Sequence, residues 1–298
     1  MKQARLSRLI IPFFLAGCLI IGYWFYWDKA ARQIETQVRA ALPATAATSA
    51  KVSGFPYRLT LEIKDLNVTA QNGLAFTSSK LVATATPFNP LLWVLEGALD
   101  PKLALPAGPA RPLKADNLKA SLRLHQTGLE RFSLTFDGLQ AGGVDGWASG
   151  KGLFHVMTRF EDDTSFAVVA DVSAVRIAKP LEGPGAILGQ TISRIFVSGP
   201  LSQRQALAKS PQAWREAGGK MTIMAGQIMW GPVALTQAKG ELTLSQDDKW
   251  QGTIAGQGAL KPEGVAVSGL SGPVSLEFKD GRLSLSGLPG INLSDSFR

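Results

Sequence analysis

The sequence contains little of what metal sites and disulfides are built from. Among 298 residues there is one cysteine, Cys18, and there are two histidines, His125 and His155. A single cysteine allows neither an intramolecular disulfide nor a cysteine-based metal site. Neither histidine has a second histidine or a glutamate at the spacing used by helical zinc sites. We therefore expect both histidines to be hydrogen-bonded or solvated, and we predict no metal and no cofactor.

Motifs for catalysis are also missing. There is no Gly-x-Ser-x-Gly sequence, and the glycine-rich stretches at 183–190 and 256–264 lack the Rossmann spacing, so we expect them to be turns. The one dense carboxylate cluster, Glu161-Asp162-Asp163, lies between two apolar strand candidates and is expected to be a solvated loop. The sequence predicts a protein that is not an enzyme. A membrane-tethered hydrolase that uses these carboxylates is the alternative.

Charge is sparse and unevenly distributed. Charged residues make up 18% of the chain, and the net charge is +8. Residues 1–42 hold six basic and two acidic side chains, so about half of the surplus belongs to the N-terminal end. The remainder has no dense run of lysine or arginine, which argues against a nucleic acid partner.

The longest charge-free segment is Leu9 to Trp27, which is 19 residues long. As a helix it would span about 28 Å, close to the roughly 30 Å of a bilayer core. Its far end carries aromatic residues of the kind that favour the headgroup boundary: Tyr23, Trp24, Tyr26 and Trp27. We predict a basic cytoplasmic segment (1–8), a transmembrane anchor (9–27) and a periplasmic body at the bacterial inner membrane. The lipid bilayer is then a partner.

Residues Leu15 to Cys18 also fit a lipobox, which would make the chain a lipoprotein acylated at Cys18; an ordinary cleaved signal peptide is a third option. However, apolar residues and the aromatic group follow Cys18, where a lipoprotein has a polar tether. This favours the uncleaved anchor.

Residues 28–42 have helical periodicity, with Ile34, Val38, Ala41 and Leu42 on one face, and Pro43 is expected to end the helix. We expect this helix to continue from the anchor and to rest on the membrane surface or on the body. A short connector of small residues, 43–50, follows.

Beyond residue 50 the dominant period is two, which is typical of antiparallel strands with one buried and one solvated face. Apolar residues alternate with polar ones at 118–124, 132–136, 166–172 and 274–278, and Asp280-Gly281 predicts a tight hairpin. Ser210 as N-cap, Pro211 and Gly218-Gly219 predict a short helix within a connector at 201–219.

The prediction is a mainly β protein with antiparallel sheet, one N-terminal transmembrane helix and a few short helices. A larger β region (51–200) precedes the connector and a smaller one (220–298) follows it. One packed core would account for the alternation.

The phrases "SGFPYRLTLEI" (53–63) and "ATPFNPLLWVLEG" (85–97) are the most distinctive in the chain. Together with an N-terminal anchor ending in "YW" and an all-β body, they resemble the domain-of-unknown-function 2125 (DUF2125) family of bacterial envelope proteins. The architecture is also distantly similar to AsmA-like envelope proteins, which are linked to lipid transport and outer-membrane homeostasis. The resemblance implies an envelope protein and brings no catalytic residue.

These phrases supply our candidate residues. Pro56 is expected to hold Phe55 extended, so that Phe55 and Tyr57 point to one face of a strand. They would either be buried as a folding motif or line an apolar groove near the membrane with Trp93. The complete candidate set is Gly54, Phe55, Pro56, Tyr57, Arg58, Asn89, Pro90 and Trp93. The function expected is binding of a lipid or other apolar ligand, or support of a complex of envelope proteins; a pure structural scaffold is the alternative.

Overall fold

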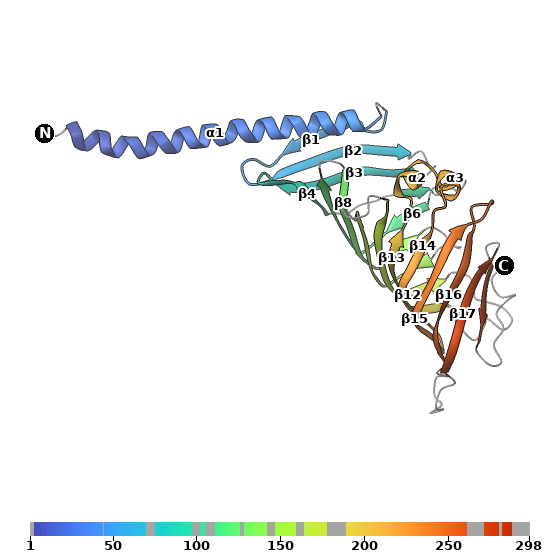
Figure 1. The fold of residues 1–298 in the computed structure, drawn as a ribbon. Helices are drawn as coiled ribbons and strands as arrows, with labels where there is room; N and C mark the ends of the chain where they lie inside the picture. Colours follow the sequence, from blue (N-terminus) through green and yellow to red (C-terminus); the bar gives the residue numbers. More distant parts are fainter. Residues whose placement is uncertain are drawn as a thin grey trace.

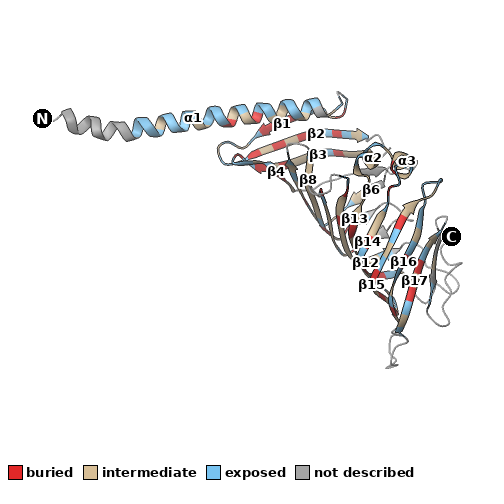
Figure 2. Cartoon of the chain, viewed as in Figure 1, coloured by how far each residue is buried: buried red, intermediate tan, exposed pale blue. Residues whose placement is uncertain are grey.

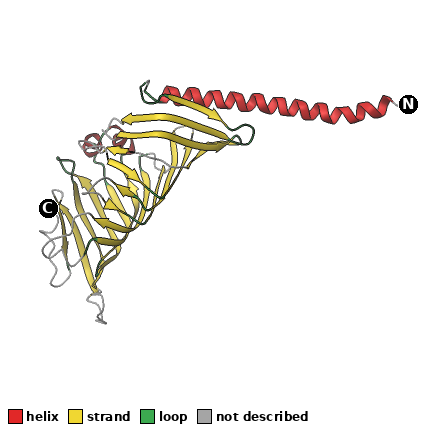
Figure 3. Ribbon diagram, turned by 180° about the vertical axis from the view of Figure 1, so that it is seen from behind, coloured by secondary structure: helices red, strands yellow, loops and turns green. Residues whose placement is uncertain are grey.

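The structure is a computed structural model that describes residues 3–43, 45–69, 75–96, 102–104, 111–125, 128–141, 147–158, 164–177, 189–260, 271–279 and 282–287. Its main features are one long N-terminal helix and one continuous curved sheet (Figure 1). Figure 3, seen from behind, shows the sheet as a single layer with the long helix lying along its β1–β2 end. The prediction of a mainly β protein with antiparallel sheet is confirmed.

Helix α1 spans Gln3–Ala41 and joins the predicted anchor and the predicted helix 28–42 without a break. It ends before Pro43, as expected. Trp27 and Ala31 are buried in the body, and Ile34, Val38 and Leu42 pack against the same core. The second half of α1 therefore rests on the body. Among the residues that the structure describes, no helix is both long enough and apolar enough to cross a membrane.

In the described part of the chain the sheet has eighteen strands. They are β1 (Ser49–Ser53), β2 (Leu59–Thr69), β3 (Ala75–Thr86), β4 (Asn89–Glu96), β5 (Lys102–Ala104), β6 (Arg111–Lys114), β7 (Asn117–His125), β8 (Gly128–Asp137), β9 (Gln140–Ala141), β10 (Trp147–Ala148), β11 (Lys151–Thr158), β12 (Phe166–Ile177), β13 (Thr191–Leu201), β14 (Met221–Trp230), β15 (Val233–Leu244), β16 (Trp250–Leu260), β17 (Ser271–Lys279) and β18 (Arg282–Ser286).

All registered strand pairs are antiparallel. The main path runs β1-β2-β3-β4-β7-β8-β11-β12-β13-β14-β15-β16-β17-β18. The short strands β5, β6, β9 and β10 form a side branch between β3 and β12. The predicted hairpin near the C-terminus is present as β17 paired with β18, although Asp280 and Gly281 themselves lie outside the described residues.

Two short helices, α2 (Arg204–Lys209) and α3 (Pro211–Glu216), form the connection between β13 and β14. Ser210 caps α3 as predicted, because its hydroxyl accepts a hydrogen bond from the Ala213 amide at 3.0 Å. Trp214 is buried and donates from its indole nitrogen to the Ser202 carbonyl at 2.6 Å. Since β13 pairs directly with β14, the strands on both sides of the connector belong to one sheet.

The expected strand beginning at Phe55 is wrong in its first residues. Residues Phe55 to Tyr57 form a turn, the Arg58 amide donates to the Gly54 carbonyl at 3.1 Å, and β2 begins at Leu59. Pro56 has no amide hydrogen to contribute to a strand ladder, so the turn at this place is physically reasonable. Phe55 and Tyr57 are both exposed, so the two aromatics are not buried as a folding motif.

The sheet has two buried hydrophobic clusters where a single core was expected (Figure 2). The N-terminal core joins α1 to β1, β2, β3 and β4 and includes Trp27, Leu59 and Trp93. The C-terminal core lies on β14 to β17 and includes Leu235, Ile254 and Val274. The strands between them contribute no buried member to either cluster.

Candidate functional site

One face of the sheet is apolar across ten neighbouring strands. Residues paired in antiparallel strands point to the same face. Following the register from β1 to β14 gives a single row: Val52, Leu61, Ala83, Leu95, Ala120, Leu134, Phe154, Ala170, Val197 and Gly226. No member of this row is polar. The apolar face is therefore continuous between the two cores.

Most side chains in the middle of this face are half-buried, although Phe136 and Val168 on the same face are buried. We call the half-buried part the central apolar face and define it as eight side chains of β8, β11, β12 and β13: Phe132, Leu134, Phe154, Val156, Phe166, Ala170, Val172 and Ile195. None of the eight belongs to, or packs against, either hydrophobic cluster. Helix α1 packs on the N-terminal core, and α3 contacts β15. The guanidinium of Arg204, on α2, lies 5.9 Å from the Phe166 ring at one border of the face.

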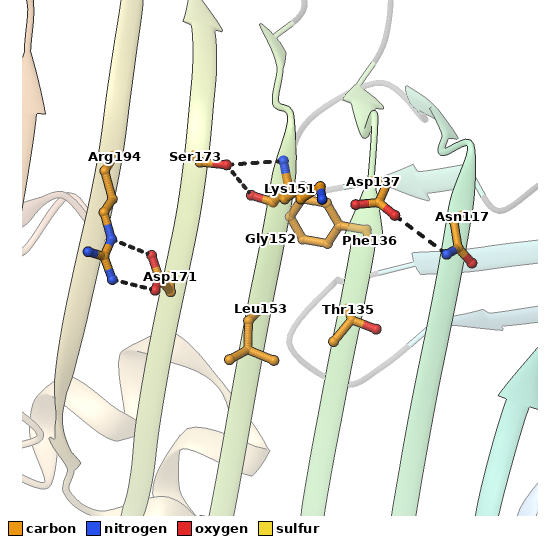
Figure 4. A pocket seen from close by; sticks show the side chains of 10 residues that line it. All are labelled: Asn117, Thr135, Phe136, Asp137, Lys151, Gly152, Leu153, Asp171, Ser173 and Arg194. Atoms are coloured by element: carbon orange, nitrogen blue, oxygen red, sulfur yellow. Dashed lines mark hydrogen bonds and ion pairs between the residues drawn. The ribbon is translucent and has the colours of Figure 1, made fainter.

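The opposite face of the same strands carries more polar side chains and an open cleft of about 440 Å³ (Figure 4). Its strongest interaction is a bidentate ion pair, in which Arg194 Nε and Nη2 donate to Asp171 Oδ1 and Oδ2 at 2.9 and 2.7 Å. The hydrogen bonds and positive charge of Arg194 hold the pKa of Asp171 below its usual value, against the opposing effect of desolvation. The carboxylate is thus ionised and occupied by the guanidinium, which makes it a poor free base.

The rest of the cleft is held by weaker polar contacts. The Ser173 hydroxyl bonds to both the carbonyl and the amide of Lys151, at 3.1 and 3.2 Å. Asn117 donates to Asp137 at 3.5 Å. On the same polar face, His155 Nδ1 lies 2.7 Å from the Ser133 hydroxyl, which confirms a hydrogen-bonded histidine. The polar groups described here are thus hydrogen-bonded to one another.

The predicted candidate residues divide between three places. Arg58 and Asn89 line a second cavity of about 280 Å³ with residues of β3 and β4, whereas Trp93 is buried in the N-terminal core. Phe55 and Tyr57 are exposed at the turn and do not line a groove with Trp93. Pro90 is half-buried on β4.

The four aromatic residues expected at the membrane boundary also differ from one another. Tyr23 is half-buried, while Trp24 and Tyr26 are exposed. Trp27 is buried and donates from its indole nitrogen to the Arg58 carbonyl at 3.1 Å. The end of the expected anchor is therefore hydrogen-bonded to the turn before β2.

Ring contacts join α1 to two turns of the sheet. The Tyr23 ring centroid lies 5.9 Å from that of Phe55 and 6.0 Å from that of Phe88. The Tyr23 hydroxyl donates to the Pro56 carbonyl, and the Tyr26 hydroxyl donates to the Pro87 carbonyl at 3.0 Å. These contacts fix the turn before β2 and the turn between β3 and β4 at the level of Tyr23 to Trp27.

Within the described ranges there is no group of three or more histidine, cysteine, aspartate or glutamate residues that could hold a metal ion. Cys18 is an exposed free cysteine on α1. The carboxylates Glu161, Asp162 and Asp163 lie outside the described residues.

Sequence reasoning missed the central apolar face as a site. The alternation on each strand was visible, and so was the scarcity of helical segments that could cover so many one-sided strands. Those two signals together point to an apolar face without a second layer.

The model of the family described as "Uncharacterized protein conserved in bacteria (DUF2125)" matches residues 24–266, which is most of the chain. Comparisons with curated proteins and with solved structures give no match. The likeness to AsmA-like proteins is therefore not shown. The match begins within the aromatic end of α1 and runs through β16, so it includes the two turns, the central apolar face and the polar cleft. The chain belongs to the DUF2125 family of proteins conserved in bacteria.

Proposed function

We propose that the protein is anchored in the bacterial inner membrane by residues 9–27, with its body in the periplasm, and that the central apolar face binds the acyl chains of a lipid. The observation that carries the second part is an apolar face between the two cores on which the eight side chains of the central apolar face are half-buried. A contiguous apolar surface that remains partly accessible is typical of a binding site.

The dimensions suit an acyl chain. Neighbouring strands lie about 4.8 Å apart, so the five strands from β7 to β13 cover roughly 19 Å across the face. Every methylene group removed from water contributes about 0.8 kcal/mol, so an extended chain lying along the row Leu134, Phe154, Ala170 and Val197 would be held without any specific polar contact. Such binding selects for an apolar chain and places the headgroup outside the face.

Support for the anchor comes from the first half of α1. Residues 9–27 carry no charge and follow three basic residues. Nine large apolar side chains between Phe13 and Tyr26 are exposed to solvent in the isolated chain. A bilayer would remove them from water, whereas the body does not.

The acyl-chain proposal is tested by native mass spectrometry of the full chain in detergent. We expect the wild-type protein to carry lipid-sized adducts and Phe154→Glu to lose them, because a carboxylate in the middle of the face must remain hydrated. Leu153→Glu is the matched control: the neighbouring residue of the same strand points to the polar cleft, and its variant should retain the adducts. Equal lipid occupancy in the two variants would contradict the proposal.

The anchor is tested separately at Cys18. Cys18→Ala should change the protein mass only by the side-chain difference and should leave the protein in the membrane fraction after alkaline washing. Loss of a lipid-sized mass, or release into the soluble fraction, would instead identify a lipoprotein.

A further inference from the structure

Exposed large apolar side chains gather at one end of the molecule. Seventeen are exposed among the described residues, and nine of these lie on α1 between Phe13 and Tyr26. Four more lie on or beside the two turns that Tyr23 contacts: Phe55, Tyr57, Phe88 and Leu91. The remaining four, three methionines and Trp250, are scattered over the rest of the sheet. This distribution is not that of an ordinary solvated surface.

The two turns carry their aromatic residues outward. Tyr57 is 83% exposed and Phe88 is 82% exposed, although each lies next to residues that pack well. Tips of tight turns normally carry small or polar residues. Aromatic side chains at such positions lose hydrophobic stabilisation unless another apolar phase covers them.

Helix α1 holds both turns at a defined position along its axis. The Tyr23 ring contacts Phe55 and Phe88, and the hydroxyls of Tyr23 and Tyr26 bond to backbone carbonyls of the two turns. Tyr23 and Trp27 are about 6 Å apart along the helix axis, at a rise of 1.5 Å per residue. The turns therefore lie at the level where the charge-free segment of α1 ends, and Figure 1 shows α1 continuing beyond them away from the sheet.

We propose that these two turns form a membrane-docking surface, in which Tyr57, Phe88 and Leu91 enter the headgroup region of the same bilayer that holds α1. The inference rests on the proposed anchor. Aromatic rings favour this interfacial layer, where one edge meets acyl chains and another meets water. The exposed Arg58 beside Tyr57 adds a positive charge suited to anionic headgroups. The sheet is thereby held against the membrane by three contacts, the helix and both turns, instead of swinging on the helix alone.

The test uses the full chain in vesicles of phosphatidylethanolamine and phosphatidylglycerol, with an environment-sensitive fluorophore on a single cysteine. Four proteins are compared: the wild type labelled at Cys18, and Tyr57→Cys, Phe88→Cys and Met224→Cys, each in a Cys18→Ala background. Met224 is the matched control, because it is also exposed but lies on β14, far from α1 along the sheet. Spin-labelled lipids with the quencher near the headgroup or deep in the chain report the depth of each label.

We expect strong quenching of the label at position 18 by the deep quencher, of the labels at 57 and 88 by the shallow quencher, and little quenching at 224. A quenched label at 18 with unquenched labels at both 57 and 88 would overturn the docking surface and leave the anchor intact. An unquenched label at 18 with quenched labels at 57 and 88 would overturn the anchor and keep the docking surface. No quenching at any position refutes both.

Discussion

The same apolar face of one sheet is more deeply buried at its C-terminal strands than at most positions of its central strands. Leu235 and Val274, on β15 and β17, are each 2% exposed, whereas Leu134 and Phe154, on β8 and β11, are half-buried. Both regions have antiparallel strands of similar length and a period of two. The alternation of apolar and polar residues within a strand therefore does not determine how deeply its apolar face is buried.

Close approach of strands at glycines contributes to the packing of the C-terminal core. In the C-terminal region large side chains lie beside glycines: Ile254 pairs with Gly240, and Val274 pairs with Gly256. A Cβ at Gly240 would meet the Thr253 carbonyl oxygen at 2.1 Å, so only glycine permits this approach. In the central region Leu134 pairs with Phe154, and both are large, but Phe136 pairs with Gly152. Both kinds of pair therefore occur in both regions, because Ile254 also pairs with the large Leu276 in the C-terminal core.

The largest expected effect separates the two regions by stability. Leu235→Ala in the closed core should lower the free energy of unfolding by about 2–5 kcal/mol, because it leaves a cavity in a shielded site. Leu134→Ala on the central face should cost about 1 kcal/mol, because its side chain is already partly solvated. Denaturant unfolding of both variants, followed by tryptophan fluorescence in the same detergent, provides the comparison. Equal losses would show that the central face is packed as tightly as the core.

A smaller effect tests the role of the glycines. Gly256→Val should lower stability by about 1–3 kcal/mol, because its Cβ would lie 2.6 Å from the Thr236 carbonyl oxygen and the strands must separate. Ala170→Val adds similar bulk to the central face and should change stability by less than about 0.5 kcal/mol. Thermal midpoints of the two variants measure the difference. If Ala170→Val were as damaging as Gly256→Val, the close approach of strands at Gly256 would not distinguish the C-terminal core from the central face.

The smallest expected effect concerns the polar face behind the open region. The pKa of Asp171 is lowered in the folded protein by Arg194, so the stabilisation is present at neutral pH and is lost as the pH falls through that lowered value. Asp171→Asn should cost up to about 1 kcal/mol near neutral pH, because the pair is partly exposed.

The same variant should remove this part of the acid dependence of stability, and Arg194→Gln should remove it as well. Denaturant unfolding between neutral and acidic pH measures the slope. A slope that stays the same in both variants would exclude the pair as its source.

Much of the local structure could be predicted from the sequence, because it depends on neighbouring residues. The strands around Leu118–Leu124 and Phe166–Val172, the cap at Ser210 and the helix face of Ile34, Val38 and Leu42 all follow from local periodicity and turn chemistry. The pairing of β8 with β11, or of Leu134 with Phe154, could not be predicted in this way. It depends on which distant segments meet and in what register, and the two-core arrangement follows from that register.

The candidate site shows the same limit. Phe55 and Tyr57 were predicted as strand residues because aromatic and polar residues alternate there, yet the turn from Gly54 to Arg58 ends the pattern. The turn is contacted at Phe55 by Tyr23 and at the Arg58 carbonyl by Trp27, and both partners are about thirty residues away along the chain.

Site-specific photo-cross-linking in intact membranes tests most directly whether the central apolar face holds an acyl chain. A photoreactive phenylalanine analogue is placed at position 154, on the central apolar face, or at position 153, in the polar cleft. We predict a lipid-sized mass adduct at position 154 after illumination and none at position 153. Adducts at neither position, or equal adducts at both, would contradict the claim.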